Sequence, residues 1–282
     1  MRIANLNERL VLVVDDNAGT ALDVESASNG LFSADPQAIY PRWQEFLAWA
    51  PSADTSQARA FDPRELGAPA PRPAQVFAIG LNYRDHAAEA GLALPDTPTV
   101  FTKFVGSFTG PYDDVVLAGP TVDWEVELVA VIGTRARRVP AERGWDHVAG
   151  LTAGQDLSER TVQGAGPAPQ FSLGKSFPGF GPTGPWLVTP DELGDRDDIA
   201  LGCAVNGESV QKGRTSDLVF TVPQLIAELS AVLELQPGDV IFTGTPAGVG
   251  AGRTPKRFLA AGDELVTSIE GIGTMRHQLV SA

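Results

Sequence analysis

The chain has 282 residues, of which 43% are hydrophobic and 20% are charged, and its formal net charge at pH 7 is −14. This composition excludes a disordered chain, because 13 Phe and 5 Trp side chains require a sizeable core. The negative charge repels phosphate backbones, so no nucleic-acid partner is expected. The single cysteine, Cys203, excludes a disulfide framework and a site of several thiolates.

No segment reaches the roughly 20 apolar residues that a membrane-spanning helix requires. The apolar run over residues 10–14 is shorter still, and two aspartates follow it at once, which is not the pattern of a secretory signal peptide. We therefore expect a cytoplasmic protein with no membrane partner.

The first 70 residues predict a small α/β unit. Residues 2–5 and 10–14 favour a short hairpin, and the Asp-Pro pair at 35–36 is typical of a helix start. Apolar residues at helical spacing over 39–50 then form one apolar face. Residues 51–73, which are rich in Ala, Pro, Ser and Asp, are typical of a linker.

Short β-like segments separated by turn residues dominate the rest of the chain. They predict strands over residues 76–79, 99–105, 115–117, 125–132, 148–153, 199–205, 240–243 and 264–269. Asn206-Gly207 indicates a hairpin, and residues 222–235 indicate the one clear helix. Many short strands with few helices favour an α+β, β-rich fold over a doubly wound sheet. We expect a small amino-terminal domain over 1–70 and a catalytic domain over 71–282.

The most informative segment is Asp-Trp-Glu-Val-Glu-Leu-Val-Ala-Val-Ile at 123–132. Side chains alternate along a strand, so Glu125 and Glu127 point to one face, about 7 Å apart. Two carboxylates at this spacing repel each other unless a positive charge lies between them. Mg²⁺, Mn²⁺ or Ca²⁺ would suit these oxygens better than zinc. A solvated acidic face is the alternative, and the segment taken alone favours it.

A third acid follows the next predicted strand. Asp156 ends the mostly apolar segment 149–156, and strands commonly deliver site residues at such a position. The alternative is that Asp156 caps a turn through Ser158 and Glu159. Both interpretations stay open at this point.

His86 lies shortly after the predicted strand over 76–79. In a helix, His86 and Glu89 are i and i+3 neighbours and can touch. Glu89 would then hold one imidazole nitrogen and leave the other free to take a proton from water. The pair alone favours the alternative, an exposed helix with an incidental His–Glu contact. His147 and His277 lack patterned polar neighbours, which indicates structural or surface roles.

Lys175 lies in the apolar segment 171–177, where burying a lysine is costly. It could stabilise a developing oxyanion or orient a substrate carboxylate. The alternative is a loop lysine that extends to water. The glycine-rich segment 243–250 lacks the lysine of a phosphate-binding loop and opens no helix, so nucleotide binding is not expected. We predict a tight turn there that presents Thr243, Thr245 and backbone N–H groups.

Taken together and in this order, these segments resemble the fumarylacetoacetate hydrolase family. The matching segments are Gly80-Leu81-Asn82-Tyr83 with His86 and Glu89, Glu125-Val126-Glu127-Leu128, Asp156-Leu157-Ser158-Glu159-Arg160 with Gln163, Leu173-Gly174-Lys175-Ser176-Phe177, Pro182-Thr183-Gly184-Pro185-Trp186, Val205-Asn206-Gly207, and residues 243–250. The resemblance covers residues 75–280. The first 70 residues resemble the small extra domain of longer bacterial members.

The resemblance implies a mixed, barrel-like β-sheet core and a homodimer. It also implies that Glu125, Glu127 and Asp156 bind Mg²⁺ or Mn²⁺, with Ca²⁺ as a further candidate. Because these cations accept the same oxygen ligands, the sequence leaves the preferred one open.

The resemblance also implies catalytic roles for three further residues. His86 and Glu89 would activate water, and Lys175 would assist at the metal-bound oxygens. The residues implied to bind substrate are Tyr83, Arg160, Gln163 and Thr245.

Family members cleave, decarboxylate or isomerise β-dicarbonyl and 2-oxo acid compounds. We predict a metal-dependent hydrolase that cleaves a carbon–carbon bond in a β-diketo acid, an acylpyruvate or a fumarylacetoacetate-like compound. Water activated by His86 would attack the distal carbonyl, and the metal-stabilised enolate of a 2-oxo acid would leave. The alternatives are oxaloacetate decarboxylation or isomerisation of a dienoic 2-oxo acid, and, outside enzymes, a binder of metal and a small acid.

One position departs from the family pattern. Many bacterial members carry an acidic residue three positions after the family lysine, where this chain has Pro178. This departure concerns the substrate rather than the metal, and the sequence leaves the acyl group open.

Overall fold

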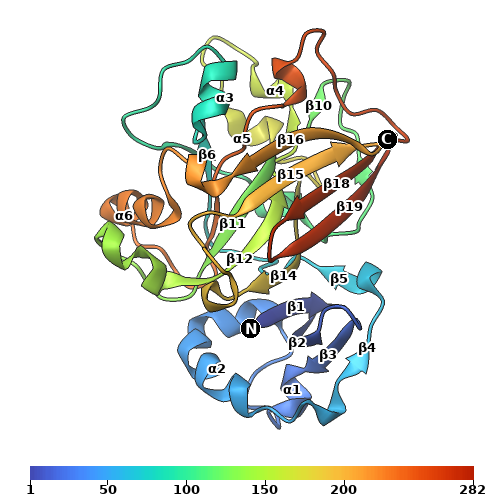
Figure 1. Ribbon diagram of the computed structural model, residues 1–282, viewed down its shortest axis with the longest axis vertical. Helices are drawn as coiled ribbons and strands as arrows, with labels where there is room; N and C mark the ends of the chain where they lie inside the picture. The colour runs from blue at the N-terminus through green and yellow to red at the C-terminus, as the bar shows by residue number, and fades with distance from the viewer.

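The computed structural model describes residues 1–282 and shows an α+β fold built mainly on open sheets (Figure 1). The strands of the large sheet are β1 (Arg2–Leu6), β2 (Arg9–Asp15), β3 (Thr20–Asp23), β4 (Arg59–Ala60), β5 (Leu66–Gly67), β6 (Val76–Gly80), β7 (Thr99–Phe101), β8 (Phe108–Thr109), β11 (Val126–Ile132), β12 (Val148–Gln155), β14 (Gly181–Val188) and β17 (Val240–Phe242). Their order is β4-β3-β2-β1-β14-β12-β11-β17-β6-β7, with β5 beside β1 and β8 beside β14. The β-rich α+β class predicted from the sequence is confirmed, and the sheets stay open rather than closing into a barrel.

Two smaller sheets complete the strand framework. The second sheet has the order β16-β15-β18-β19-β9, and β10 pairs with β13 in a ribbon of two strands. The bounds of these strands are β9 (Val115–Val116), β10 (Val122–Asp123), β13 (Ser158–Glu159), β15 (Ala200–Val205), β16 (Glu208–Arg214), β18 (Glu264–Ile269) and β19 (Gly273–Val280).

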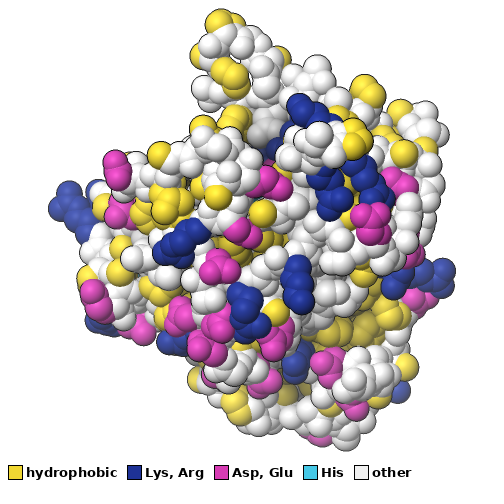
Figure 2. All heavy atoms as spheres, turned by 45° about the horizontal axis from the view of Figure 1, so that its top comes forward, with side chains coloured by type: hydrophobic (Ala, Val, Ile, Leu, Met, Phe, Trp, Pro, Cys, Tyr) yellow, Lys and Arg dark blue, Asp and Glu magenta, His cyan; other side chains and the backbone are white.

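Six short α-helices lie around the sheets. They are α1 (Val24–Ala27), α2 (Trp43–Trp49), α3 (Arg84–Glu89), α4 (Arg160–Gln163), α5 (Phe171–Gly174) and α6 (Val222–Val232). Helices α1 and α2 lie at one end of the molecule with strands β1–β5, and α3, α4 and α5 lie at the opposite end (Figure 1). None of the helices has the length and hydropathy needed to span a bilayer. On the face turned toward the viewer in Figure 2, acidic and basic side chains are interspersed.

Strands β11 and β12 form the centre of the large sheet, and every residue of both strands is buried. Alternate side chains of β11 enter different cores because successive residues of a strand point to opposite faces. Val126 and Leu128 belong to the larger core, whereas Val129 and Val131 pack into the smaller core with the amino-terminal elements. Glu127 lies on the same face of β11 as Val129 and Val131. The smaller apolar core therefore lies directly beside the Glu127 carboxylate.

The amino-terminal predictions hold with one change of geometry. The predicted hairpin is formed by β1 and β2, and the Asp35 side chain accepts a hydrogen bond from the Gln37 N–H. The segment Pro36–Arg42 is a 3-10 helix, and the α-helix begins only at Trp43 because Pro41 interrupts the earlier turn. The predicted linker contains 3-10 turns and the short strands β4 and β5.

The amino-terminal strands extend the sheet of the rest of the chain, since β1 pairs antiparallel with β14. The predicted domain boundary at residue 70 falls between β5 and β6 and stays a prediction.

In the remainder of the chain, all eight predicted strand segments contain a strand. The strand predicted over 99–105 ends earlier, at Phe101. The helix predicted over 222–235 ends at Val232. Strand β14 escaped prediction because its sequence, Gly-Pro-Thr-Gly-Pro-Trp-Leu-Val, contains two glycines and two prolines. The Asn206-Gly207 hairpin is confirmed, and both residues have the positive φ that a tight two-residue turn requires.

His277 in β19 is buried, and its Nδ1 donates to the Asp113 carbonyl oxygen over 2.8 Å. Burial lowers the pKa of His277 below its ordinary value of 6.5, although the Asp113 carbonyl and the charges of Asp113 and Asp114 oppose this shift. The folded chain therefore holds a neutral imidazole at pH values where the unfolded chain begins to bind a proton.

We expect the free energy of unfolding to fall as the pH drops below 6.5, because the unfolded state then binds the additional proton. Urea unfolding measures the free energy of unfolding at pH 7.5 and at pH 5.5. Between these pH values, this free energy should fall by about 1 kcal/mol more in the parent chain than in His277→Gln, whose side chain cannot titrate. An equal loss in both proteins would contradict a neutral buried His277.

Candidate active site

Three buried carboxylates meet where β11 begins and β12 ends. Val126 pairs with Gln155 across the two strands, and this register places Asp156 beside Glu125. The Asp156 N–H donates to the Glu125 carbonyl oxygen over 2.9 Å. One carboxylate oxygen from each of Glu125, Glu127 and Asp156 lies within 4.8 Å of the other two. The three residues predicted as metal ligands are thus brought together.

Of the three carboxylates, only that of Glu127 has no contact with a lysine or an arginine. Its Oε2 accepts a hydrogen bond of 2.8 Å from the Gly244 N–H. Burial, together with the nearby charges of Asp156 and Glu125, raises the pKa of Glu127 well above its ordinary value. Burial acts on Glu125 in the same direction, but Lys175 and Arg160 outweigh it and lower the pKa of Glu125 to about 2.

Two buried lysines hold Asp156 from two sides. The Lys103 Nζ lies 2.6 Å from Oδ1 of Asp156 and also donates to the Lys175 carbonyl oxygen. The Lys175 Nζ lies 2.7 Å from Oδ2 of Asp156 and 2.7 Å from Oε2 of Glu125. Burial lowers the pKa of Lys103. Burial also acts to lower that of Lys175, but Asp156 and Glu125 outweigh it and raise the pKa.

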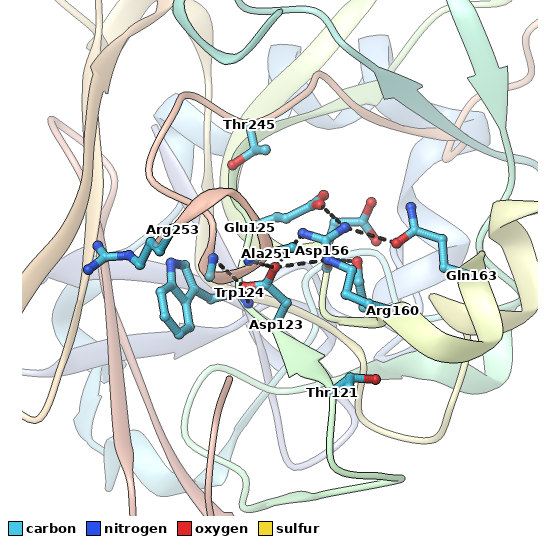
Figure 3. A network of polar contacts seen from close by, with 12 residues as sticks. Thr121, Asp123, Trp124, Glu125, Asp156, Arg160, Gln163, Thr245, Ala251 and Arg253 are labelled. Carbon is cyan, nitrogen blue, oxygen red and sulfur yellow. Dashed lines mark hydrogen bonds and ion pairs between the residues drawn. The ribbon is translucent and has the colours of Figure 1, made fainter. Parts of the chain in front are cut away.

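Arg160 lies between Asp123, a fourth buried carboxylate of the cluster, and Glu125 (Figure 3). Its Nη2 is 2.7 Å from Oδ2 of Asp123, and its Nη1 is 2.7 Å from Oε1 of Glu125. The same Nη1 donates to the Gln163 side-chain oxygen over 2.9 Å. Asp123 also accepts from the N–H groups of Gly250 and Ala251, at 2.7 and 2.9 Å. Asp123 therefore anchors both Arg160 and the loop that follows β17.

The charges of this cluster do not balance. Four carboxyl groups face three cations, so that of Glu127 has no cationic partner, and burial without this counter-charge raises its pKa. The carboxylates are Asp123, Glu125, Glu127 and Asp156, and the cations are Lys103, Arg160 and Lys175. An oxygen-only donor set with excess negative charge fits Mg²⁺, Mn²⁺ or Ca²⁺ and does not suit zinc.

The histidine–glutamate pair exists and is fixed by the loop after β17. The Nδ1 of His86 and Oε2 of Glu89 lie 3.1 Å apart, and their side chains are 15% and 21% exposed. Oε1 of Glu89 accepts a hydrogen bond of 3.0 Å from the Gly248 N–H. Gly252 has no Cβ, and one built there would lie 2.8 Å from the Glu89 carboxyl carbon. Glu89 thus engages Nδ1 and leaves Nε2 of His86 without a partner in the chain.

A cavity of about 210 Å³ lies between His86 and two carboxylates of the triad. His86, Glu125, Glu127 and Lys175 line it, as do three residues predicted to bind substrate, Arg160, Gln163 and Thr245. The Thr245 hydroxyl donates to the Val126 carbonyl oxygen and accepts from the Gln211 amide, so its orientation is fixed. The predicted turn presents the Gly244 N–H to Glu127, as described above.

Tyr83, also predicted to bind substrate, does not line this cavity. Its side chain is buried in the larger core, and its hydroxyl group has no hydrogen-bond partner. Burial raises the pKa of Tyr83, so the hydroxyl stays neutral.

Two residues of the cluster were missed from the sequence. Lys103 follows β7 in the segment Val-Phe-Thr-Lys-Phe-Val, and a lysine within such an apolar run was the available signal. Asp123 directly precedes Trp124 and Glu125, where it was indistinguishable from a residue that ends a turn.

The model of the family Fumarylacetoacetate (FAA) hydrolase C-terminal matches residues 75–280 of this chain. The chain belongs to the fumarylacetoacetate hydrolase family. The resemblance stated from the sequence motifs is confirmed.

Relatives within the fumarylacetoacetate hydrolase family carry several enzyme names. The human protein "Oxaloacetate tautomerase FAHD2A, mitochondrial" is 45% identical over 215 residues, which cover 76% of this chain and 68% of the relative. An HpcE-like protein from Mycobacterium smegmatis has a solved structure with a TM-score of 0.94 and 55% identity, covering all of both chains.

A maleylpyruvate hydrolase from Sphingobium sp., solved in complex with manganese(II) and pyruvate, has a TM-score of 0.77 and 29% identity over 100% of both chains. The relatives of this chain thus include enzymes, and the tautomerase and the hydrolase named here act on small acids.

Asp123→Asn should lower the free energy of unfolding by about 3–5 kcal/mol, because it removes one partner from a buried ion pair. Asp198→Asn is the matched control, since Asp198 pairs with Arg214 at the surface, and its loss should change stability little. Denaturant unfolding of both variants measures the difference. Similar effects in the two variants would show that Asp123 is not the anchor described here.

Proposed function

We propose that this member of the fumarylacetoacetate hydrolase family is a metal-dependent hydrolase that cleaves the carbon–carbon bond of an acylpyruvate-like β-diketo acid. The observation that carries the proposal is that His86, held by Glu89, lines the same cavity as Glu125 and Glu127, two carboxylates of the triad that Asp156 completes. A group able to take a proton from water beside a site for a 2-oxo acid is what hydrolysis requires.

The residues that would hold the cation are Glu125, Glu127 and Asp156, with Mg²⁺ or Mn²⁺ as the proposed ions. The unbalanced charge at Glu127 supports this assignment, as does the manganese in the structure of the Sphingobium hydrolase. When bound, such a cation supplies Lewis-acid stabilisation of negative charge on the oxygens of a 2-oxo acid.

The side chains of this protein would transfer the proton and stabilise the developing negative charge. His86 would accept a proton from water at Nε2, while Glu89 holds Nδ1 and stabilises the imidazolium that forms. Lys175 and Arg160 would offset negative charge on the substrate as the bond breaks. The products would be pyruvate and the carboxylate of the acyl group: the oxygen of water joins the acyl carbon, one proton goes to the methyl carbon of pyruvate, and the other is released to solvent.

A second candidate is tautomerisation of a 2-oxo acid, favoured by the 45% identity with the human oxaloacetate tautomerase. It would use the same cavity, with His86 moving a proton between carbon and oxygen and no water consumed. Formation of two products from one β-diketo acid separates hydrolysis from this alternative.

The triad predicts that Glu127→Gln weakens Mn²⁺ binding at least about 10-fold, because a neutral amide replaces the carboxylate that lacks a counter-ion. Glu89→Gln is the matched control, since Glu89 lies outside the triad and should leave the Mn²⁺ affinity unchanged. Calorimetric titration of the apo-proteins measures both. If Glu127→Gln bound Mn²⁺ like the parent, the cation would have to sit elsewhere.

For the chemistry, the parent chain with Mn²⁺ should release one acetate and one pyruvate from each acetylpyruvate. His86→Asn should lower kcat at least about 100-fold, because it removes the general base. Chromatographic quantification of both products checks the stoichiometry, and Mn²⁺ titration confirms that the variant still loads metal. Full activity in His86→Asn would rule out the proposed role, and conversion of oxaloacetate tautomers without any cleavage would favour the second candidate.

The homodimer implied by the family resemblance stays a prediction, which light scattering on the purified chain would decide. The cytoplasmic location also stays a prediction, which fractionation of the source cells would decide.

A further inference from the structure

We propose that the cavity selects substrates whose acyl tail is uncharged and apolar and discriminates against a tail that ends in a second carboxylate. This inference deepens the proposed function and rests on it for the orientation of the substrate, with the 2-oxo acid end at Glu125, Glu127 and Asp156.

The lining of the cavity has two chemically different parts. The polar lining residues are His86, Thr99, Glu125, Glu127, Arg160, Gln163, Lys175 and Thr245. The other part is formed largely by apolar side chains, among them Ile79, Leu81, Leu92, Phe101 and Phe171. The rings of Phe101 and Phe171 pack edge to face with their centroids 5.6 Å apart, which gives this wall a fixed aromatic surface.

Every lysine and arginine that lines the cavity is already paired with an acid, and His86, which also lines it, is held by Glu89 at Nδ1 and has its Nε2 assigned to water in the proposed hydrolysis. Arg160 contacts Asp123 and Glu125, and its remaining interaction is with the Gln163 side chain. Lys175 contacts Glu125 and Asp156. The Lys175 Nζ lies 5.1 Å from the centroid of the Phe101 ring, but both of its acid partners are already in place, so a distal carboxylate would find no free lysine or arginine to neutralise it.

The chain segments that frame the cavity offer no substitute. Residues 76–83, 161–174 and 243–252 contain no ionisable side chain other than that of Tyr83. Between residues 84 and 101 the only lysine or arginine is Arg84, whose Nη1 donates to the Leu218 carbonyl oxygen over 2.8 Å. The same stretch contains three acids, Asp85, Glu89 and Asp96, which would repel a carboxylate-tailed substrate.

The apolar wall continues outward into exposed hydrophobic side chains. Leu92, which lines the cavity, is 54% exposed, and Leu173, two residues after Phe171, is 67% exposed. An apolar tail would gain by covering such surface. A carboxylate in the same position would lose hydration without gaining a counter-charge.

The direct test compares two acylpyruvates of equal length with the Mn²⁺-loaded chain. Butyrylpyruvate ends in a methyl group, and succinylpyruvate ends in a carboxylate at the same position. We expect kcat/KM to be at least 100-fold higher for butyrylpyruvate. Equal values, or a preference for succinylpyruvate, would overturn the inference.

A binding experiment separates this inference from the proposed hydrolysis. Calorimetry with 2-oxohexanoate and 2-oxoadipate, which differ only in the tail carboxylate, requires no turnover. Tighter binding of 2-oxohexanoate by the Mn²⁺-loaded chain would support the inference even if neither acylpyruvate were cleaved, in which case only the proposed function would fail. Equal binding, or tighter binding of 2-oxoadipate, would overturn the inference whatever the outcome for hydrolysis.

A pair of variants then locates the tail. Leu92→Arg places a cation on the cavity wall and should raise kcat/KM for succinylpyruvate at least 10-fold. Leu94→Arg adds the same charge two residues along the loop, at an exposed position that does not line the cavity, and should leave this value nearly unchanged. Equal gains in both variants, or a gain in neither, would overturn the assignment of the tail to this wall.

Discussion

The structure depends on the arrangement of buried charge around Asp156. A carboxylate in the interior of a protein is tolerated only when cations or hydrogen-bond donors compensate for its lost hydration. Lys103 and Lys175 provide that compensation for Asp156, and Lys175 with Arg160 provides it for Glu125. Glu127 receives only a backbone N–H, so the cluster lacks one positive charge to balance Glu127 in its ionised form. This imbalance is the physical reason why a divalent cation fits here.

The same cluster links the carboxylates to the histidine that would act as the base. Asp123 binds Arg160 on one side and the N–H groups of Gly250 and Ala251 on the other. The loop that these N–H groups belong to also holds Glu89 through the Gly248 N–H, and Glu89 orients His86. The position of the histidine is therefore tied to the carboxylate cluster through one short, uncharged loop. A displacement of the Asp123 carboxylate would therefore move both Arg160 and the loop that holds Glu89.

Much of the framework could be predicted from local patterns. The alternating apolar residues of β11, the Asn206-Gly207 turn and the spacing of His86 and Glu89 each depend on residues close together in the chain. Predictions failed where local signals conflicted with packing. Strand β14 is rich in glycine and proline but pairs between β1 and β12 nevertheless, because its neighbours supply the hydrogen bonds that define it.

By itself, the sequence determined the residue types of the site, the shared face of Glu125 and Glu127, and the family to which the chain belongs. Only the tertiary structure decided that Lys103 and Asp123 join the cluster, that Tyr83 stays in the core, and that Arg160 and Lys175 in the cavity lining are both paired with acids. The reason is that ion pairing and burial depend on residues far apart in the chain, such as Lys103 and Asp156. Local periodicity carries no information about which of these distant side chains will meet.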